Sequence, residues 1–372
     1  MEAVDRFKPR AGFMFGARLK IARARAGLSL RDLEERIGNL VSAQAIGKYE
    51  RGEMMPGSRV LIALADVLGV SERYLVSQSE IRLEQVEFRH KKSATRHEAA
   101  QVEAAALDLL ERYLEIEELL QVASVEWNRP REGRQPVSSP ADAELAAAKL
   151  RQYWNLGGDS IAVPGLAEFL EEQGIKVLAL ELPGKFLGLT CWVRRKDAEA
   201  IPVIVINNRH NGERQRFTLS HELGHLVMES QPGFVDEECA ADRFAGAFLM
   251  PPDTIRAEVG NHRKGISLGE LFALKILFGA GVSAIVNRLK DLGIIGTGLY
   301  RELCSGFAKA GWLEPPYEEP SPLPKEEPQR FRRLCFRALA EETVSEAKAA
   351  ELLDLSVREL NRAMEQPPSD AV

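Results

Sequence analysis

The stretch QRFTLSHELGHLVM, residues 215–228, constrains this 372-residue chain more than any other. It lacks proline, and its apolar residues recur at helical spacing, so we predict a helix with one buried side. Residues four apart lie on one face of a helix, and His221 and His225 therefore point at the same place. Zinc binds two imidazoles and a carboxylate while leaving a fourth position for water. Glu222 projects beside this site, where it is placed to take a proton from that water.

A third protein ligand is expected from the next predicted helix, which runs up to two prolines. Glu238 and Asp242 are four residues apart and share a face, so one is free to bind the metal while the other holds a ligand histidine in one tautomer. We choose Glu238 as the ligand and Asp242 as the histidine's partner, with Glu237 as the alternative ligand. Cys239 is a possible soft ligand but is expected to point into packing. His210, in the preceding loop, is expected to lie at the surface.

The sequence pattern of residues 142–313 predicts a domain of mixed helices and strands. Three stretches rich in branched residues are expected as strands: IKVLALEL, LGLTCWV and PVIVIN. The stretches around them, including LGELFALKIL and VSAIVNRLKDLG, have helical periodicity. We expect the strand LGLTCWV to hold a substrate backbone by strand addition.

The N-terminal 75 residues predict five short helices separated by tight turns. Ser29 and Ser42 precede two of these helices and are good N-cap residues. Gly38 and Gly52 follow the same two helices and favour their termination. A small all-helical domain is therefore expected at this end of the chain.

Charge is unevenly distributed along the chain. The whole sequence has a net charge of −6, whereas residues 1–75 hold 13 Lys and Arg against 9 Asp and Glu, a surplus of +4. A basic end on an acidic protein indicates an anionic partner for that end.

The four cysteines include no CxxC pair, which favours a reducing compartment. Since no stretch of about 18 apolar residues is present, we expect a cytoplasmic protein with no membrane partner.

RFTLSHELGHLVM followed by EECAADRFAGAFLMP resembles the ImmA/IrrE family of zinc metallopeptidases, and the likeness extends from about residue 142 to 292. The resemblance implies a gluzincin-like domain with Glu222 as general base and a Zn²⁺ ion bound by His221, His225 and Glu238. Many family members have another glutamate where this chain has Ala240, which leaves Glu238 as the carboxylate in register. The family's known activity is cleavage of a partner repressor of the XRE type under stress.

LSLRDLEERIGNLVSAQAIGKYERGEMMPGSRVLIALADVLGVS resembles the XRE (Cro-type) helix-turn-helix domain, over about residues 13–75. The resemblance implies a recognition helix at about 42–50, whose first residues face base edges in the major groove. In this register the base-facing residues are Ser42, Ala43, Gln44, Gly47 and Lys48, of which Gln44 suits adenine. The cations expected at phosphates are Arg18, Arg31, Lys48 and Arg51. Ile46 and Tyr49 are expected in the core. A helical bundle for protein contact is the alternative.

The expected fold is multidomain, mainly α with an α+β part. The five expected segments are a helix-turn-helix domain (1–75), a helical connector and linker (76–141), a metallopeptidase domain with a small sheet (142–313), a proline-rich acidic linker (314–328) and a helical tail (329–372). The stretch FRHKK, residues 88–92, is expected to begin a charged helix in the connector. In the tail, Ser345 and Ser356 are expected to cap two helices that resemble a second small helix-turn-helix.

These resemblances imply a DNA-binding transcriptional regulator with a zinc-dependent endopeptidase domain. The expected partners are double-stranded operator DNA, a second copy of the chain, and a protein substrate or toxin. The substrate is expected to be a partner repressor or the chain itself, in a stress, phage or toxin–antitoxin response. The alternative is a regulator or antitoxin whose peptidase-like domain senses or dimerises without significant proteolysis.

Overall fold

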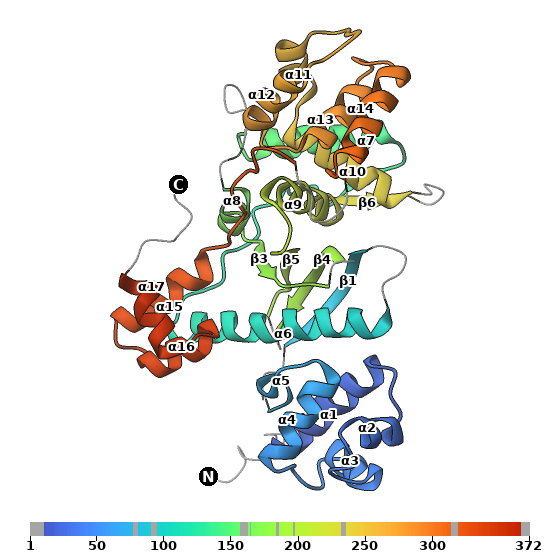
Figure 1. Cartoon of the computed structure of the whole chain (residues 1–372). Coiled ribbons are helices and arrows are strands. Elements are labelled where there is room, and N and C mark those ends of the chain that lie inside the picture. Colours follow the sequence, from blue (N-terminus) through green and yellow to red (C-terminus); the bar gives the residue numbers. More distant parts are fainter. Residues whose placement is uncertain are drawn as a thin grey trace.

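The computed structural model describes residues 11–76, 81–90, 95–156, 163, 165–183, 186–195, 198–231, 236–313 and 319–365. Figure 1 shows a small helical domain at the bottom, a sheet between helices in the middle, a further group of helices at the top and a helical tail at the side. The expected mainly α fold with one α+β part is confirmed.

The N-terminal domain consists of five short helices, as expected. They are α1 (Ala11–Arg25), α2 (Leu30–Arg36), α3 (Ala43–Glu50), α4 (Ser58–Leu68) and α5 (Glu72–Val76). Ser29 caps α2 in a capping box with Asp32, and Ser42 caps α3 by accepting a hydrogen bond from the backbone of Ala45. These caps satisfy backbone donors that a helix N-terminus leaves without partners. Ile46 and Tyr49 lie in the domain's core, as expected.

The central sheet has four strands in the order β1-β4-β5-β3. They are β1 (Arg82–His90), β3 (Lys176–Leu180), β4 (Phe186–Arg194) and β5 (Ile201–Asn207). Strand β4 is antiparallel to both β1 and β5, whereas β3 is parallel to β5. The three strands expected between residues 142 and 313 are therefore present, and β1 is a fourth strand.

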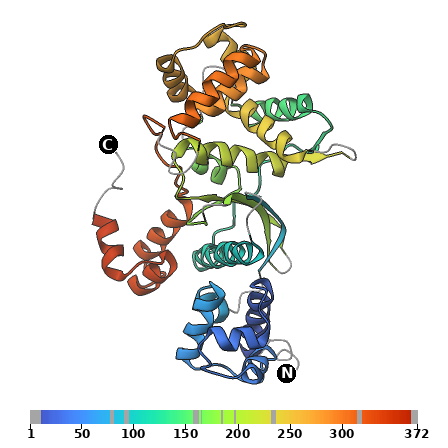
Figure 2. The same cartoon turned by 45° about the vertical axis from the view of Figure 1, so that its right-hand side comes forward.

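Two long helices cover the two faces of the sheet. Helix α6 (Arg96–Leu119) lies below the sheet in Figure 1 and α9 (Gly212–Val227) lies above it, an arrangement that Figure 2 also shows. Side chains alternate between the faces of a strand. In β5, Val203 and Val205 accordingly join the core on the α6 side, and Ile204 and Ile206 join the core on the α9 side.

The upper helices pack around α9 and extend the same core. They are α7 (Pro140–Tyr153), α8 (Leu166–Glu172), α10 (Glu237–Leu249), α11 (Pro252–Val259), α12 (Leu268–Phe278), α13 (Val282–Asp291) and α14 (Thr297–Lys309). A two-stranded parallel sheet joins β2 (Gln135–Val137) to β6 (Met228–Ser230) at the end of α9. Among the described residues no single helix has the length and apolarity to cross a membrane, and only α12 and α13 taken together, with a 94° bend between them, reach that threshold.

The C-terminal tail contains α15 (Arg330–Ala340), α16 (Glu346–Leu353) and α17 (Val357–Glu365). Ser345 caps α16, and the Ser356 hydroxyl accepts a hydrogen bond from the backbone of Glu359 in α17, as expected. The tail packs against α6, and the Arg112 side chain donates a 2.9 Å hydrogen bond to the backbone carbonyl of Leu352.

The proline-rich acidic segment packs more closely than expected. Residues 314–318 lie outside the described residues, but 319–328 run against the upper helices without forming a helix or strand. Glu326 is buried and pairs with Arg216 of α9, and its carboxylate also accepts a 2.8 Å hydrogen bond from the backbone of Ala167. Glu319 accepts a hydrogen bond of 2.9 Å from Lys275. The segment is thus tied to the peptidase-like domain by buried ion pairs.

The expectation of a helical connector followed by a linker at 76–141 is correct for α6 and wrong for the residues before it. Residues 82–90 form β1, so FRHKK begins in a strand and not in a helix, and β2 lies within the expected linker. Leu83 and Phe88 face the α6 core, whereas Glu84 and Glu87 face away from it. An irregularity between Glu84 and Glu87 inserts one extra residue, which hides the period-two pattern of a strand.

Candidate metal centre

Helix α9 places two histidine side chains at one point. Asn211 caps the helix, accepting a 3.2 Å hydrogen bond from the backbone of Arg214, and nearly every later residue of α9 is buried. The sheet and α10 hold this helix between them. His221 and His225 lie one turn apart, and their Nε2 atoms are 3.1 Å from each other.

Helix α10 brings a carboxylate to the same point. Asp236 caps α10, and Phe244 packs the helix against α9. A Cβ at Gly224 would lie 3.1 Å from a ring carbon of Phe244, so the glycine of HELGH allows the two helices their close approach. The nearer oxygens of Glu238 lie 3.4 Å from His221 Nε2 and 3.5 Å from His225 Nε2.

The three donor groups fit a tetrahedral metal ion. Bonds of about 2.0–2.1 Å in tetrahedral geometry place ligand atoms about 3.3 Å apart. The donor separations of 3.1, 3.4 and 3.5 Å are close to this spacing. In the described part of the chain His221, His225 and Glu238 form the one group of three potential ligand residues that meets on a point. Two imidazoles and one carboxylate are a donor set that zinc can take, and the three residues are the expected ones.

Two further carboxylates orient the imidazole rings. Asp242 Oδ1 lies 2.7 Å from His221 Nδ1, and Glu87 Oε2 lies 3.5 Å from His225 Nδ1. Each contact leaves Nε2 facing the metal position, which is the usual arrangement of a metal-binding histidine. Asp242 is the partner predicted from the sequence. Glu87 was not predicted, because it comes from β1, more than 130 residues before His225.

The electrostatics of the site favour a bound cation. Hydrogen bonds from His221 and His225 hold the pKa of Glu238 well below its usual range. For His225, burial lowers the pKa, but the hydrogen bond to Glu238 and the charges of Glu222, Glu238 and Glu87 outweigh it, so the pKa is raised. The imidazoles therefore lie in a field of negative charge that a metal ion would also experience.

Glu222 is held with one oxygen free. The Thr190 hydroxyl of β4 donates a 2.7 Å hydrogen bond to Glu222 Oε2. Glu222 Oε1 is buried and has no hydrogen-bond partner, and the side chain as a whole is 1% exposed. A Cβ at Gly188 would lie 3.3 Å from Oε1, so β4 is closely opposed to the carboxylate. An orphaned buried oxygen beside the histidine pair is suited to accept a proton from water at the metal.

The other potential ligands lie outside the three-residue cluster. His210 is buried, 4% exposed, which corrects the expectation of a surface residue. Cys239 is exposed, so the expectation that it points into packing is also wrong. Glu237 borders a small cavity of about 180 Å³ together with Glu87 and His225.

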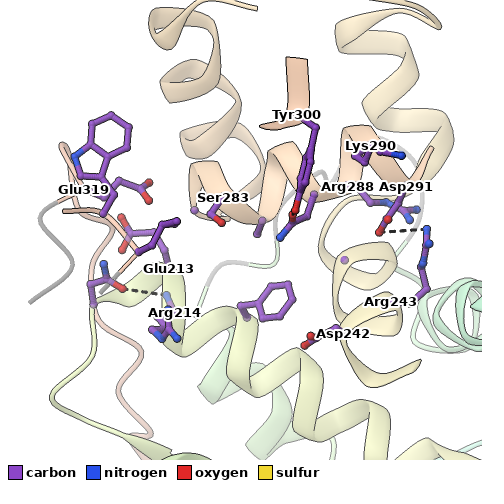
Figure 3. A pocket seen from close by; sticks show the side chains of 18 of the residues that line it. Glu213, Arg214, Asp242, Arg243, Ser283, Arg288, Lys290, Asp291, Tyr300 and Glu319 are labelled. Carbon is purple, nitrogen blue, oxygen red and sulfur yellow. Dashed lines mark hydrogen bonds and ion pairs between the residues drawn. The ribbon is translucent and has the colours of Figure 1, made fainter. Parts of the chain in front are cut away.

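A larger cavity of about 460 Å³ adjoins the centre between α9, α10, α13 and α14. Asp242, the partner of His221, stands in its wall (Figure 3). The labelled side chains are mostly charged, and two of them, Arg243 and Asp291, form an ion pair of 3.2 Å. The Tyr300 hydroxyl donates a hydrogen bond of 2.9 Å to Asn287. This cavity offers a polar recess next to the metal position.

Strand β4 has no free edge in this structure. It pairs with β5 on one side and with β1 on the other. The expectation that LGLTCWV binds a substrate by strand addition is therefore not met in this conformation, because a strand of the chain itself already occupies the position.

Most of the predicted DNA-contacting residues are exposed, and a few are partly or fully buried. Ser42, Gln44, Lys48, Arg31 and Arg51 are exposed, and Ala43 is half-buried. Arg51 forms a 2.6 Å ion pair with Glu53 at the surface. Gly47 is buried, and a Cβ there would lie 3.6 Å from Leu30, so this position of α3 faces α2 and is not presented to DNA.

Arg18 corrects the prediction of a phosphate contact. It is 6% exposed, forms an ion pair with Glu111 of α6 and donates a 3.0 Å hydrogen bond to the backbone carbonyl of Tyr74. The guanidinium ties the N-terminal domain to α6 and is not presented to DNA. Helix α6 comes from outside the helix-turn-helix stretch, so that stretch alone does not indicate this partner.

Comparisons with known proteins match two separate segments of the chain, the N-terminal helices and the region around the candidate metal centre. Residues 19–75 match the family model for a helix-turn-helix, and residues 170–290 match that for an IrrE N-terminal-like domain, of peptidase family M78. The SPbeta prophage-derived uncharacterized HTH-type transcriptional regulator YonR of Bacillus subtilis (strain 168) is 38% identical over 63 residues, which are 17% of this chain and 56% of that protein. The chain thus spans about half the length of this relative. No solved structure matches the chain.

The fold and the two family matches define the class of protein. It joins a helix-turn-helix domain of the XRE type to an IrrE N-terminal-like domain of a metallopeptidase family. The metal cluster of His221, His225 and Glu238 lies within the second matched segment, and the exposed residues of α3 lie within the first.

Proposed function

We propose that this protein is a DNA-binding transcriptional regulator whose second domain is a zinc-dependent endopeptidase. The observation that carries the proposal is the set of three donors at zinc spacing next to a buried carboxylate oxygen without a partner. A structural zinc site has four protein ligands, whereas a catalytic site has three and leaves one position open. Three ligands and a poised base therefore favour catalysis.

The chain's own residues would act in a defined order. When bound, zinc supplies Lewis acidity and lowers the pKa of a bound water to about 7. Glu222 would take a proton from the attacking water on Oε1 and later deliver it to the leaving amine. Thr190 holds the other oxygen and so directs the free one. Asp242 keeps the His221 ring turned toward the metal position, and Glu87 does the same for His225 while β1 is paired with β4.

The remaining parts would provide DNA binding and substrate selection. Helix α3 would enter the major groove with Gln44 and Lys48 at base edges, while Arg31 and Arg51 meet phosphates. The charged cavity beside Asp242 would take a polar side chain of the protein substrate. We infer that the substrate is a regulatory protein, either a partner repressor or a second copy of this chain bound as a homodimer. The cytoplasm is the compartment in which such a regulator would act.

A second candidate is a regulator or antitoxin that binds zinc without significant proteolysis. One observation favours it: β1 covers the edge of β4 at the metal centre. Both candidates require zinc, and they differ only in whether a substrate reaches the site.

The deciding experiment compares the wild type with Glu222→Gln on a candidate partner repressor. We expect cleavage by the zinc-loaded wild type, none by Glu222→Gln, and equal zinc content in both. Glu258→Gln is the matched control, because Glu258 is an exposed glutamate on α11. Equal cleavage by Glu222→Gln and wild type would contradict the assignment of the base. A purified wild type without zinc would contradict the enzyme altogether.

A further inference from the structure

We propose that β1 occupies the place of an extended substrate, and that a polypeptide reaches the metal centre only when β1 leaves β4. This inference rests on the proposed peptidase function and adds its regulation. It assigns β4 as a docking edge for an extended polypeptide, with β1 as the internal occupant.

Strand β1 lies outside the matched domain. The segment that matches the IrrE N-terminal-like domain covers residues 170–290 and contains β3, β4, β5, α9 and α10. Strand β1 lies well before this segment, because it ends at His90. Without β1 the sheet order would be β4-β5-β3, and β4 would be an outer strand. An outer strand offers a row of unpaired backbone groups, and extended peptides bind such edges by strand addition.

The edge of β4 that β1 covers lies close to the proposed general base, Glu222. Thr190 of β4 donates its hydrogen bond to Glu222, and Gly188 lies against the same carboxylate. A peptide paired with β4 at these residues would therefore pass over Glu222. The residues of β1 opposite Thr190 and Gly188 are Glu87 and Arg89.

Strand β1 also directs a side chain to the proposed metal ligand His225. Residues directly opposite each other on paired strands project to the same face of the sheet. Glu87 is opposite Thr190, and its carboxylate lies 3.5 Å from His225 Nδ1. On its other face β1 is anchored by Leu83 and Phe88, and Phe88 makes an edge-on contact with Phe186 at 5.7 Å. The strand thus lies beside the proposed metal ligand His225, at the ring nitrogen Nδ1 that faces away from the metal position.

The pairing of β1 with β4 is interrupted. The β1–β4 ladder has irregularities between Glu84 and Glu87 and between Arg89 and His90. Gln85 has a φ of 50°, in the left-handed region that a side chain rarely adopts. On the site-facing side, the ion pair of Glu84 with Arg194 is solvent-exposed, and such pairs hold strands together weakly. A strand with these defects is easier to detach than a regular one.

The DNA-binding domain is placed to influence this strand. Helix α5 ends at Val76 and β1 begins at Arg82, so the strand follows the domain closely in the chain. Ser71, between α4 and α5, donates a 2.9 Å hydrogen bond to Asp108 of α6, the helix that follows β1. Strand β1 thus connects the N-terminal domain to α6, the helix on which that domain packs. A shift of the domain along α6 would therefore displace β1.

The test locks β1 to β4 and measures peptide binding. Arg82 and Arg194 are exposed register partners at the end of the ladder, and Arg82→Cys with Arg194→Cys provides a reversible cross-link. The background carries Glu222→Gln to prevent turnover and Cys239→Ser to remove an exposed thiol. The probe is fluorescein-labelled unfolded casein, followed by anisotropy, and Arg82→Cys alone is the matched control.

We expect the oxidised protein to bind the probe at least about tenfold more weakly than the reduced protein, with no change in the control. A second variant releases the strand: Leu83→Ala with Phe88→Ala removes its apolar anchors. It should bind the probe at least about tenfold more tightly than the unmodified background. Its backbone amides at 188–194 should also exchange hydrogen faster, which reports detachment without any turnover.

The outcomes separate this inference from the proposed function. Equal probe affinity in the oxidised and reduced states overturns the role of β1. So does a release variant whose β4 amides exchange quickly without tighter probe binding. Zinc content is measured on the same samples: its absence from all of them contradicts the proposed peptidase, whereas zinc-loaded protein with unchanged probe affinity contradicts only the role of β1.

Discussion

The candidate recognition helix α3 and helix α9 of the candidate metal centre differ in how their polar side chains are placed. On α3 the candidate side chains Gln44 and Lys48 are exposed. On α9 His221 is fully buried and Glu222 is 1% exposed, and carboxylates and a hydroxyl already surround them. The first surface has its candidate contacts still to make, whereas the second has most of its polar contacts in place before any ligand arrives.

This difference indicates whether a substitution on each helix should change ligand binding, the free energy of unfolding, or both. An exposed side chain that meets only its partner changes binding when it is replaced, and leaves the free energy of unfolding nearly unchanged. A buried polar group leaves its neighbours without partners when it is removed, so the fold also suffers. Substitutions on the two helices should therefore separate into two classes.

The largest effect is expected from His221→Ala. It removes one of three ligands, together with that ligand's 2.7 Å contact with Asp242, so zinc content should fall from about one ion per chain to nearly none. Elemental analysis of the purified protein measures this directly. DNA binding should be unchanged, because α3 is remote from α9. Normal zinc content in the variant would show that the metal lies elsewhere.

A large loss of stability is expected from Arg18→Met. Removing one partner of a buried ion pair costs about 3–5 kcal/mol, because the buried Glu111 carboxylate loses the Arg18 cation that offsets its charge. Chemical denaturation followed by circular dichroism measures the free energy of unfolding. Arg31→Met is the matched control, since Arg31 is exposed and should change stability by less than about 0.5 kcal/mol. Equal stability of the two variants would mean that Arg18 is not a structural residue.

Specific operator binding should fall when Gln44→Ala and Lys48→Ala are combined. A good base contact contributes about 1–3 kcal/mol of discrimination, so specific affinity should drop by about 100-fold. Gel-shift titration at fixed salt measures this, with Arg301→Ala on α14 as a control for lost positive charge. Zinc content and unfolding midpoint should not move. If the double variant kept its specificity for the operator, the residues that contact the bases would have to lie on another helix.

The smallest effects should come from the carboxylates that orient the histidines. Loss of such a partner typically weakens metal binding about 10–100-fold. Asp242→Asn should fall in this range, and Glu87→Gln should fall below it, because its contact is 3.5 Å and the Asp242 contact 2.7 Å. Zinc competition with a chromophoric chelator gives both affinities. A larger loss for Glu87→Gln would make β1 the dominant orienting element.

Local patterns predicted most of what lies close together in sequence. The spacing of His221 and His225, and of Glu238 and Asp242, indicates helix faces directly, and the structure brings all four side chains together. The caps at Ser29 and Ser42 and the five N-terminal helices were predictable for the same reason.

What could not be predicted depends on pairing between distant segments. Strand β1 pairs with β4 about 110 residues later, as Leu83 with Val193, and its irregular ladder hides the strand pattern. Arg18 looks like a surface cation until α6 brings Glu111 to it. Glu87 and Thr190 reach the candidate site only through the sheet, so no motif around HELGH could have named them.

The distance between β1 and β4 also determines the order in which the molecule can assemble during translation. When β1 leaves the ribosome its partner strand has not been made, and at about 5–20 residues per second the wait is roughly 5–20 s. The N-terminal helices need only local contacts for most of their core and are complete by then. A nascent chain would thus present a folded DNA-binding domain while the strand behind it is still searching for a sheet.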